Sequence, residues 1–149
     1  MVEQTPLTGP EDVEEAARLR AVAERQPAFA RTLGFRLVRH SREEVVAELD
    51  VVPELGNRNG VLHGGAIMAF ADNLGGTAAS LNLPEGAATT TVESKCNFLR
   101  PVPIGTTVRG TCVPLHRGRT TSVWQTSVHD AEGRLAAMII QTQLTLPDR

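Results

Sequence analysis

The feature that most constrains this chain is one long apolar segment, residues 66–83, which contains a single charged side chain, Asp72. Its length and its content of Ala and Leu predict a helix rather than a strand. A helix that is apolar on nearly every side must be covered on nearly every side, so the rest of the chain has to wrap around it. One face carries the bulky apolar residues at helical spacing: Ile67, Phe70, Leu74, Ala78 and Leu81.

The segments on both sides of this helix alternate apolar and polar residues, as half-buried strands do. The alternation predicts two strands within residues 35–51, joined by a turn at 41–43, before the helix. After the helix it predicts strands at about 89–99, 106–115, 120–130 and 135–146. The economical arrangement is an α+β domain in which one antiparallel sheet curls around the long helix.

An additional helix is predicted at the N-terminus. Thr8, Pro10 and Glu11 form a capping-box pattern, and the residues from there to about Arg25 favour helix. With 149 residues the chain has the size of one domain. We divide it into a helical extension, residues 1–33, and a core, residues 34–149.

Composition excludes several classes of function. A net charge of −2 gives no reason to expect nucleic acid or a membrane surface as partner. Cys96 and Cys112 lack zinc or redox spacing, and the four histidines are scattered, so neither a metal site nor a disulfide framework is expected. The acidic, polar N-terminus is no signal peptide, and no apolar run is long enough to cross a bilayer. We expect a soluble cytoplasmic protein without a cofactor.

Asp72 is the candidate catalytic group. A carboxylate within an apolar helix is costly unless it is paired or hydrogen-bonded, and a desolvated carboxylate at a crevice can act as a base or a nucleophile. The structural alternative is that Asp72 is exposed at a helix bend or holds a loop through hydrogen bonds. The residues alone favour the functional interpretation.

His63, Gly64 and Gly65 stand where the loop enters this helix. The first N–H groups of a helix have no internal partner, and glycine lets a substrate carbonyl approach them, which is the requirement for an oxyanion hole. Alternatively, the two glycines only allow a tight turn, and His63 is a structural residue. A stripe of small residues on the Asp72 face invites a second subunit or a ligand: Ala69, Gly76 and Ala79.

In their order these motifs resemble a known family. Residues 57–65 (Asn-Arg-Asn-Gly-Val-Leu-His-Gly-Gly), followed by Asp72, closely resemble the signature of the hot-dog-fold acyl-CoA thioesterases of the phenylacetate-degradation (PaaI) type. Residues 98–102 with the later Gly105 resemble the family's second motif. Residues 117–120 and 130–136 resemble its C-terminal hairpins, so that the likeness covers roughly residues 33–146.

The resemblance implies the hot-dog fold, a homo-oligomer (a dimer or a dimer of dimers) with continuous sheets, and an active site at the subunit interface. It implies acyl-CoA as the substrate and Asp72 as general base or nucleophile. The backbone N–H of Gly64 would polarise the thioester carbonyl, and Asn57 would place that carbonyl or the water. His63 would support the loop and contact the thioester sulfur. A thioester is already activated, so one base and one oxyanion hole suffice without a metal.

A strand hydroxyl completes the implied site. Thr91 would orient the attacking water near the carboxylate of the other subunit, although three successive threonines leave open whether Thr90 or Thr91 does so. Aspartate is shorter than the glutamate of some relatives, which favours water activation over an anhydride intermediate. The substrate and CoA contacts are expected from four residues: Gly65, Arg100, Arg117 and Arg119. Each arginine could equally be a solvated residue at a strand end.

Three other functions compete with hydrolysis. A hot-dog hydratase or dehydratase would pair a histidine with a carboxylate in local motifs that are missing here. A non-catalytic acyl-CoA-binding or regulatory module would not require the combination of Asn57, Gly64 and Asp72. A purely structural oligomer would leave the arrangement around His63 without explanation.

Overall fold

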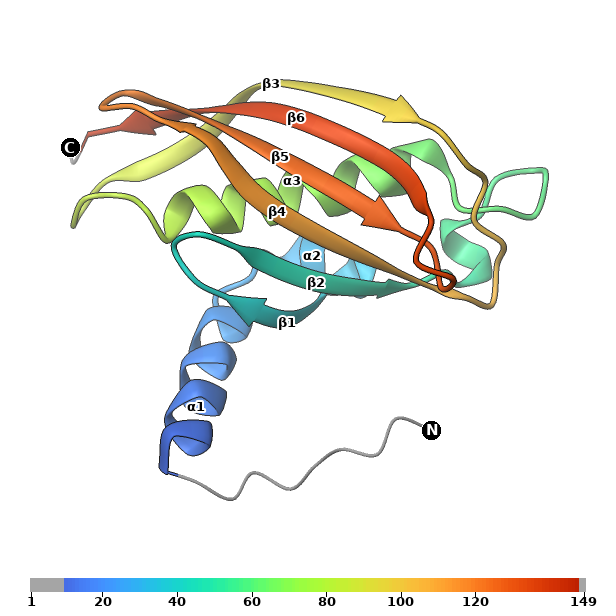
Figure 1. Ribbon diagram of the computed structural model, residues 1–149, viewed down its shortest axis with the longest axis horizontal. Coiled ribbons are helices and arrows are strands. Elements are labelled where there is room, and N and C mark those ends of the chain that lie inside the picture. The colour runs from blue at the N-terminus through green and yellow to red at the C-terminus, as the bar shows by residue number, and fades with distance from the viewer. Residues whose placement is uncertain (1–9, 148–149) are drawn as a thin grey trace.

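The centre of the fold is α3 (Gly64–Ser80), around which a single sheet is wrapped (Figure 1). The computed structural model describes the backbone of residues 10–147 and the side chains of residues 13–147. The remaining elements, in chain order, are α1 (Pro10–Glu24), α2 (Ala28–Leu33), β1 (Arg36–His40), β2 (Val45–Asp50), the 3-10 turn η1 (Pro53–Leu55), β3 (Ala88–Phe98), β4 (Thr107–Arg117), β5 (Thr121–His129) and β6 (Leu135–Leu146).

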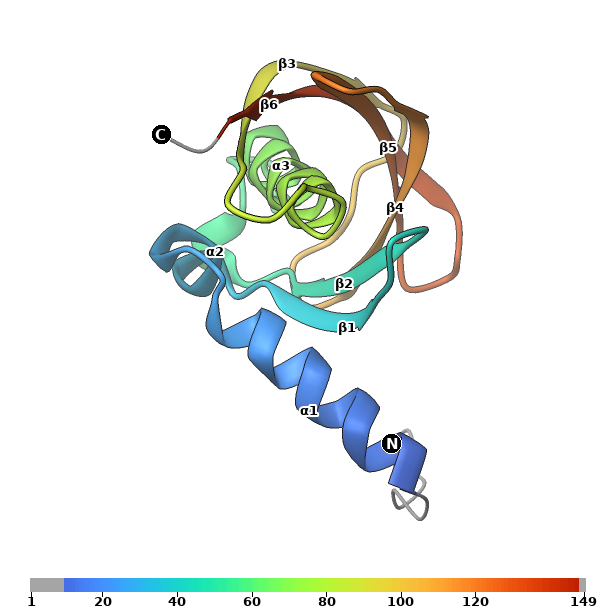
Figure 2. The ribbon, with the colours of Figure 1, turned by 90° about the vertical axis from the view of Figure 1, so that its left-hand side faces the viewer.

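The sheet has six strands in the order β1-β2-β4-β5-β6-β3, and every neighbouring pair is antiparallel. Viewed along α3, it curls around the helix, and α1 projects away from the domain beneath β1 (Figure 2). The predicted α+β class is therefore confirmed, as are the central helix, the wrapped antiparallel sheet and the extra N-terminal helix. The predicted cap at Thr8 lies outside the described residues.

α3 is held against the sheet by its bulky face. Phe70 and Leu74 are completely buried, and Ile67 is nearly so. Gly110 of β4 permits this close packing, because a Cβ built there would lie 2.5 Å from Leu74 Cδ1 and 2.7 Å from Phe70 Cε1. The helix begins two residues before the predicted start and ends three residues before the predicted end.

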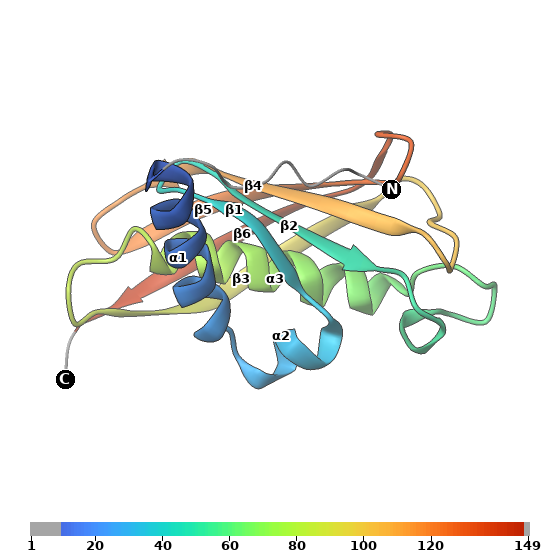
Figure 3. The same ribbon diagram turned by 90° about the horizontal axis from the view of Figure 1, so that it is seen from below.

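The N-terminal helices lie near the edge of the sheet that β1 forms (Figure 3). α1 contacts β1, and α2 contacts α3. At the junction between them, Gln26 is buried and its Oε1 accepts from Asn73 Nδ2 at 2.7 Å. Gln26 Nε2 also lies 3.3 Å from Thr77 Oγ1, so the extension is fixed to the middle of α3 by polar contacts. None of the described helices is long and apolar enough to cross a membrane.

β3 forms one edge of the sheet, and its outer side pairs with no other strand of the described chain. It is 11 residues long, and its burial pattern is mostly exposed. Val92 and Phe98 are both 56% exposed, which is unusual for large apolar side chains. A long edge strand with apolar side chains is a surface that proteins normally cover, so this edge is suited to pairing with another strand.

Candidate active site

Asp72 lies on the face of α3 that the sheet leaves uncovered. Its side chain is exposed in the single chain, which corrects the expectation of a desolvated carboxylate. Thr91 Oγ1 donates to Asp72 Oδ1 at 2.8 Å. Gln141 Nε2 lies 3.3 Å from the same oxygen and 3.4 Å from the backbone carbonyl of Asp72. The contacts therefore converge on Oδ1 and leave Oδ2 free among the described residues.

Thr91 approaches Asp72 of its own chain, whereas the family resemblance implied a place near the carboxylate of another subunit. The physical reason is that the chain reverses after α3 and β3 returns along the helix (Figure 1). Asp72 precedes Leu81 by nine residues, or ~13 Å of helix at ~1.5 Å per residue. Thr91 follows Ala87 by four residues, or ~13 Å of strand at ~3.3 Å per residue. The two distances match, so Thr91 rather than Thr90 is the strand hydroxyl that reaches the carboxylate.

At the start of α3, His63 is the N-cap residue. Its Nδ1 accepts a hydrogen bond from the N–H of Gly65 at 2.8 Å. Because Nδ1 is the acceptor, the neutral imidazole carries its proton on Nε2. The N–H of Gly64 donates to nothing among the described residues. Of the two glycines, Gly64 therefore offers the unpaired donor that an oxyanion needs.

The loop that precedes α3 is closed by Asn57. Its Oδ1 accepts from the backbone N–H of Asn59 at 2.8 Å, an Asx turn, and the backbone N–H of Asn57 donates to the carbonyl of Val61 at 2.8 Å. The side-chain Nδ2 bonds no other residue of the described chain. Asn57 thus holds the loop through Oδ1, and its Nδ2 remains available to bind another group.

The two halves of the expected site are far apart within one chain. Gly64 and Asp72 are separated by eight residues of α3, which corresponds to ~12 Å along the helix axis. A reacting carbonyl should lie about 3 Å from both the oxyanion donor and the attacking group. The side chain of Asp72 cannot cover the remaining separation, so one chain does not bring its own Gly64 and Asp72 together.

A pocket of about 580 Å³ opens beside Asp72. Its size falls within the range of small-molecule sites, ~300–1,000 Å³. The Asp72 side of the wall comes from α3 and the threonines of β3, and the opposite side comes from the junction between α1 and α2. Its polar lining residues include Arg25, Gln26, Asn73, Ser80, Thr90 and Thr91.

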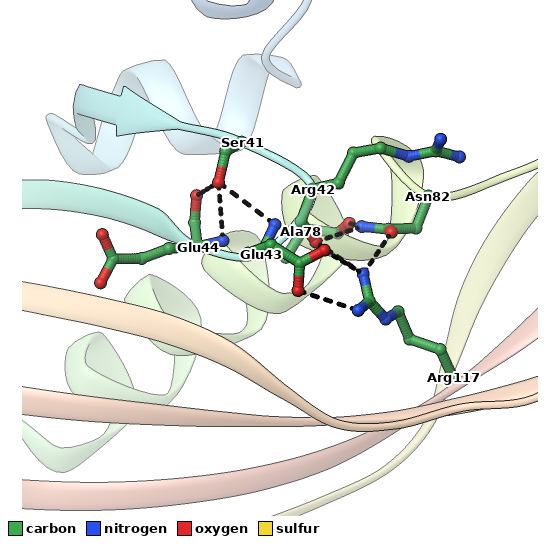
Figure 4. Close-up of polar contacts among 7 residues, drawn as sticks. All are labelled: Ser41, Arg42, Glu43, Glu44, Ala78, Asn82 and Arg117. Carbon is green, nitrogen blue, oxygen red and sulfur yellow. Dashed lines mark hydrogen bonds and ion pairs between the residues drawn. The ribbon is translucent and has the colours of Figure 1, made fainter.

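The three candidate arginines lie in different surroundings. Arg117 makes a bidentate ion pair with Glu43, at 2.9 and 2.8 Å, and also donates to Asn82 Oδ1 at 3.2 Å (Figure 4). It therefore ties the hairpin of β4 and β5 to the turn between β1 and β2 and to the residues after α3. Arg100 and Arg119 are exposed and make no ion pair with any other described residue.

Two site residues were not anticipated from the sequence, Gln141 and Gln143 of β6. Each is only 1% exposed. Gln141 contacts Asp72, and Gln143 Nε2 donates to Thr91 Oγ1 at 2.7 Å. The available signal was their spacing, because two glutamines at i and i+2 occupy the same face of a strand that is otherwise apolar there.

Other reactive groups lie away from this arrangement. Among the described residues, no three His, Cys, Asp or Glu side chains are grouped so that they could hold a metal ion. Both cysteines are free thiols. Burial raises the pKa of Cys112 to about 11, even though a hydrogen bond with Thr126 acts in the opposite direction. A thiol of this kind is not a nucleophile at neutral pH.

Residues 59–137 match the model of a protein family described as the Thioesterase superfamily. The proofreading thioesterase EntH of Klebsiella pneumoniae is 41% identical over 88 residues, which cover 59% of this chain and 64% of that protein. A Vibrio cholerae protein is 40% identical over 79 residues, which cover 53% of this chain and 52% of that one. The chain thus spans about half to two thirds of the length of these relatives.

Solved structures share the fold over most of the chain. Thioesterase HI1161 of Haemophilus influenzae is 28% identical, with a TM-score of 0.79, and the match covers 85% of this chain and 88% of that one. A Streptococcus mutans protein bound to acetyl CoA is 26% identical, with a TM-score of 0.71, over 77% of this chain and 90% of that one. The Escherichia coli PaaI protein, at 21% identity and a TM-score of 0.80, has the same fold over 91% of this chain and 96% of its own.

Proposed function

The chain belongs to the thioesterase superfamily, as its motifs predicted, and we propose that it hydrolyses acyl-CoA thioesters to a carboxylic acid and CoA. The observation that carries the proposal is the carboxylate of Asp72, held through Oδ1 by Thr91 while Oδ2 stays free. The Klebsiella pneumoniae relative that is named a proofreading thioesterase supports the reaction class. The Streptococcus mutans structure with acetyl CoA supports a CoA ester as the ligand.

The proposed reaction uses Asp72 as a general base. Oδ2 takes a proton from a water molecule, and the water oxygen forms a bond to the thioester carbon. The carbonyl oxygen becomes an oxyanion, which the N–H of Gly64 stabilises. The carbon–sulfur bond then breaks, and the departing CoA thiolate takes up the proton held by Asp72. His63, with its proton on Nε2, can donate a hydrogen bond to the sulfur as it leaves.

The proposed active site combines two subunits. Because Gly64 and Asp72 of one chain are ~12 Å apart along α3, each Asp72 must work with the Gly64 of a second chain. Two chains related by a two-fold axis, with their α3 helices antiparallel, would form two such sites. Pairing of the β3 edges would make the sheets continuous and cover Val92 and Phe98. Two such dimers would then associate into a tetramer.

Asn57 and two exposed arginines are the proposed further contacts with the substrate. Nδ2 of Asn57 is free to bind the thioester carbonyl or the water. Arg100 and Arg119, which have no ion-pair partner among the described residues, are the candidates for the phosphates of CoA. We assign the hydrolase to the cytoplasm, where the two free cysteines would remain reduced.

The proposal is tested by release of free thiol from a panel of aryl, arylacetyl and aliphatic acyl-CoAs. Wild type should hydrolyse at least one of them. Asp72→Asn keeps the shape of the side chain but removes the base, and it should lower kcat by at least ~10², the scale of a positioned general base. Asp50→Asn is the matched control, since Asp50 is an exposed carboxylate at the end of β2. Full turnover by Asp72→Asn would refute the assignment of the base.

The same panel separates the competing functions. An acyl-CoA-binding or regulatory module would bind a member of the panel tightly without releasing thiol. A hydratase or dehydratase would change the absorbance of an enoyl- or hydroxyacyl-CoA and leave the thioester intact. Either result would replace hydrolysis as the activity of the chain.

A further inference from the structure

We propose that Gln141 and Gln143 are positioning residues, which fix the carboxylate of Asp72 and the hydroxyl of Thr91 in the geometry that hydrolysis requires. This inference rests on the proposed function. It concerns a polar group formed by α3, β3 and β6 at the border between the sheet and the exposed face of α3. We define this polar group as Asp72, Thr91, Gln141 and Gln143.

The order of donors and acceptors in the polar group is set by the carboxylate. An ionised Asp72 can only accept, so the single hydroxyl proton of Thr91 must point to Oδ1, at 2.8 Å. The hydroxyl oxygen is then left as an acceptor, and Gln143 Nε2 donates to it at 2.7 Å. Oε1 of Gln143 faces Thr89 Oγ1, which donates to it at 3.0 Å. Each group is thereby held in one orientation by the next.

Gln141 approaches the carboxylate from the other side. Its Nε2 lies within 3.3 Å of Asp72 Oδ1, and the side chain occupies a space that only a glycine on the helix leaves open. A Cβ built on Gly75 would lie 2.2 Å from the carboxamide carbon of Gln141. The carboxamide therefore packs against the backbone of α3 at Gly75, where the absence of a side chain gives it room to reach Asp72.

A structural role explains Gln141 poorly. It is 1% exposed, and its Oε1 bonds no other described residue. Gln143 differs, because both ends of its carboxamide are bonded, to Thr91 and to Thr89. A buried polar atom without a partner destabilises a fold, and an apolar side chain of similar size would remove that cost. The retention of a carboxamide beside Asp72 is explained if its N–H is needed by the carboxylate.

The β3 strand is adapted to the same arrangement. A β-bulge interrupts its register with β6 between Thr91 and Glu93. Thr91 is opposite Gln143 and Ser94 is opposite Gln141, so both face α3 although they are three residues apart. In a regular strand, residues three apart point to opposite faces. The extra residue, Val92, thus turns Thr91 toward the carboxylate while the rest of the strand keeps its register.

The test uses apolar replacements of similar volume, Gln141→Met and Gln143→Met, and measures kcat, KM and Tm. We expect kcat to fall on the order of tenfold in each, the effect of one hydrogen bond to a charged system, with KM unchanged. Tm should be equal or higher in Gln141→Met, because the replacement removes the unpaired Oε1. Thr142→Val is the matched control. Thr142 stands between the two glutamines in sequence but on the other face, where it contacts Glu93, and its replacement should leave kcat unchanged.

A double-mutant cycle tests whether Gln143 affects kcat through Thr91. If Gln143 acts through Thr91, Gln143→Met should lower kcat in wild type but produce no further loss in Thr91→Val. Unchanged kcat in both glutamine variants, or a loss of kcat in Gln141→Met accompanied by a lower Tm, would overturn the inference while wild type still releases thiol. Absence of thiol release by wild type on every acyl-CoA would instead refute the proposed function, and this inference with it.

Discussion

Replacement of Gly64 by proline removes one N–H group from the start of α3 and nothing else that the helix uses. Gly64 is the first helical residue, a position that proline favours. The residue before a proline must be extended, and His63 already has φ −67° and ψ 137°. The N–H of Gly64 makes no hydrogen bond within the described chain, so no structural contact is lost. We therefore expect Gly64→Pro to fold with a Tm close to that of wild type.

The expected loss of activity follows from the role of that N–H. Removal of a single oxyanion donor lowers kcat by ~10²–10³. Gly64→Ala is the control, because alanine keeps the N–H and adds only a Cβ. This Cβ would lie 3.1 Å from Cζ of Phe98, so a shift of a few tenths of an ångström at the end of that ring accommodates it. Gly64→Ala should therefore retain kcat within a few-fold of wild type.

The assay is thiol release at saturating acyl-CoA, with Tm measured on the same samples. A large loss in Gly64→Pro together with near-normal turnover in Gly64→Ala would establish the backbone N–H as the oxyanion donor. Equal losses in the two variants would refute this reasoning, since they would show that the added side-chain atoms, and not the missing N–H, cause the defect.

Three further predictions concern groups outside the oxyanion site. Arg100→Gln should raise KM for acyl-CoA, whereas Arg117→Gln should lower Tm and leave KM unchanged, because Arg117 is engaged with Glu43. Burial alone would raise the pKa of Asp130, but the backbone N–H and guanidinium of Arg134 outweigh it and hold that pKa below its usual value. Asp130→Asn should therefore have a lower free energy of unfolding than wild type at neutral pH, and denaturant titrations should show this difference shrinking as pH falls from about 4 through the lowered pKa of Asp130. Cys112, with its pKa raised to about 11 by burial, should not react with a thiol reagent in the native protein, and reaction at neutral pH would contradict its burial.

Local features of the sequence were sufficient to predict the fold and to single out the two ends of the candidate site. Asp72 was conspicuous as the one charge in an apolar segment, and Gly64 followed a histidine at a helix start. Hydrophobic periodicity identified α3 and the strands because each depends mainly on neighbouring residues. Helix ends were less accurate, since the start at Gly64 depends on the cap that His63 provides.

Features that depend on tertiary contacts could not be predicted from local sequence patterns. The exposure of Asp72 reflects how far the sheet extends around α3, which periodicity does not determine. Thr91 meets Asp72 within one chain because of the reversal after α3 and the bulge at Val92. The ion pair between Arg117 and Glu43 joins residues that are 74 positions apart, so neither residue alone signals it.

The most direct test of a site shared between subunits is complementation between two inactive variants. Asp72→Asn and Gly64→Pro would be co-expressed with different affinity tags, and the mixed dimers purified on both tags in succession. In each mixed dimer one site carries both defects and the other is intact, so thiol release should recover to about half of the wild-type rate. Mixed dimers as inactive as either parent would contradict a shared site, because they would show that Asp72 and Gly64 must act within the same chain.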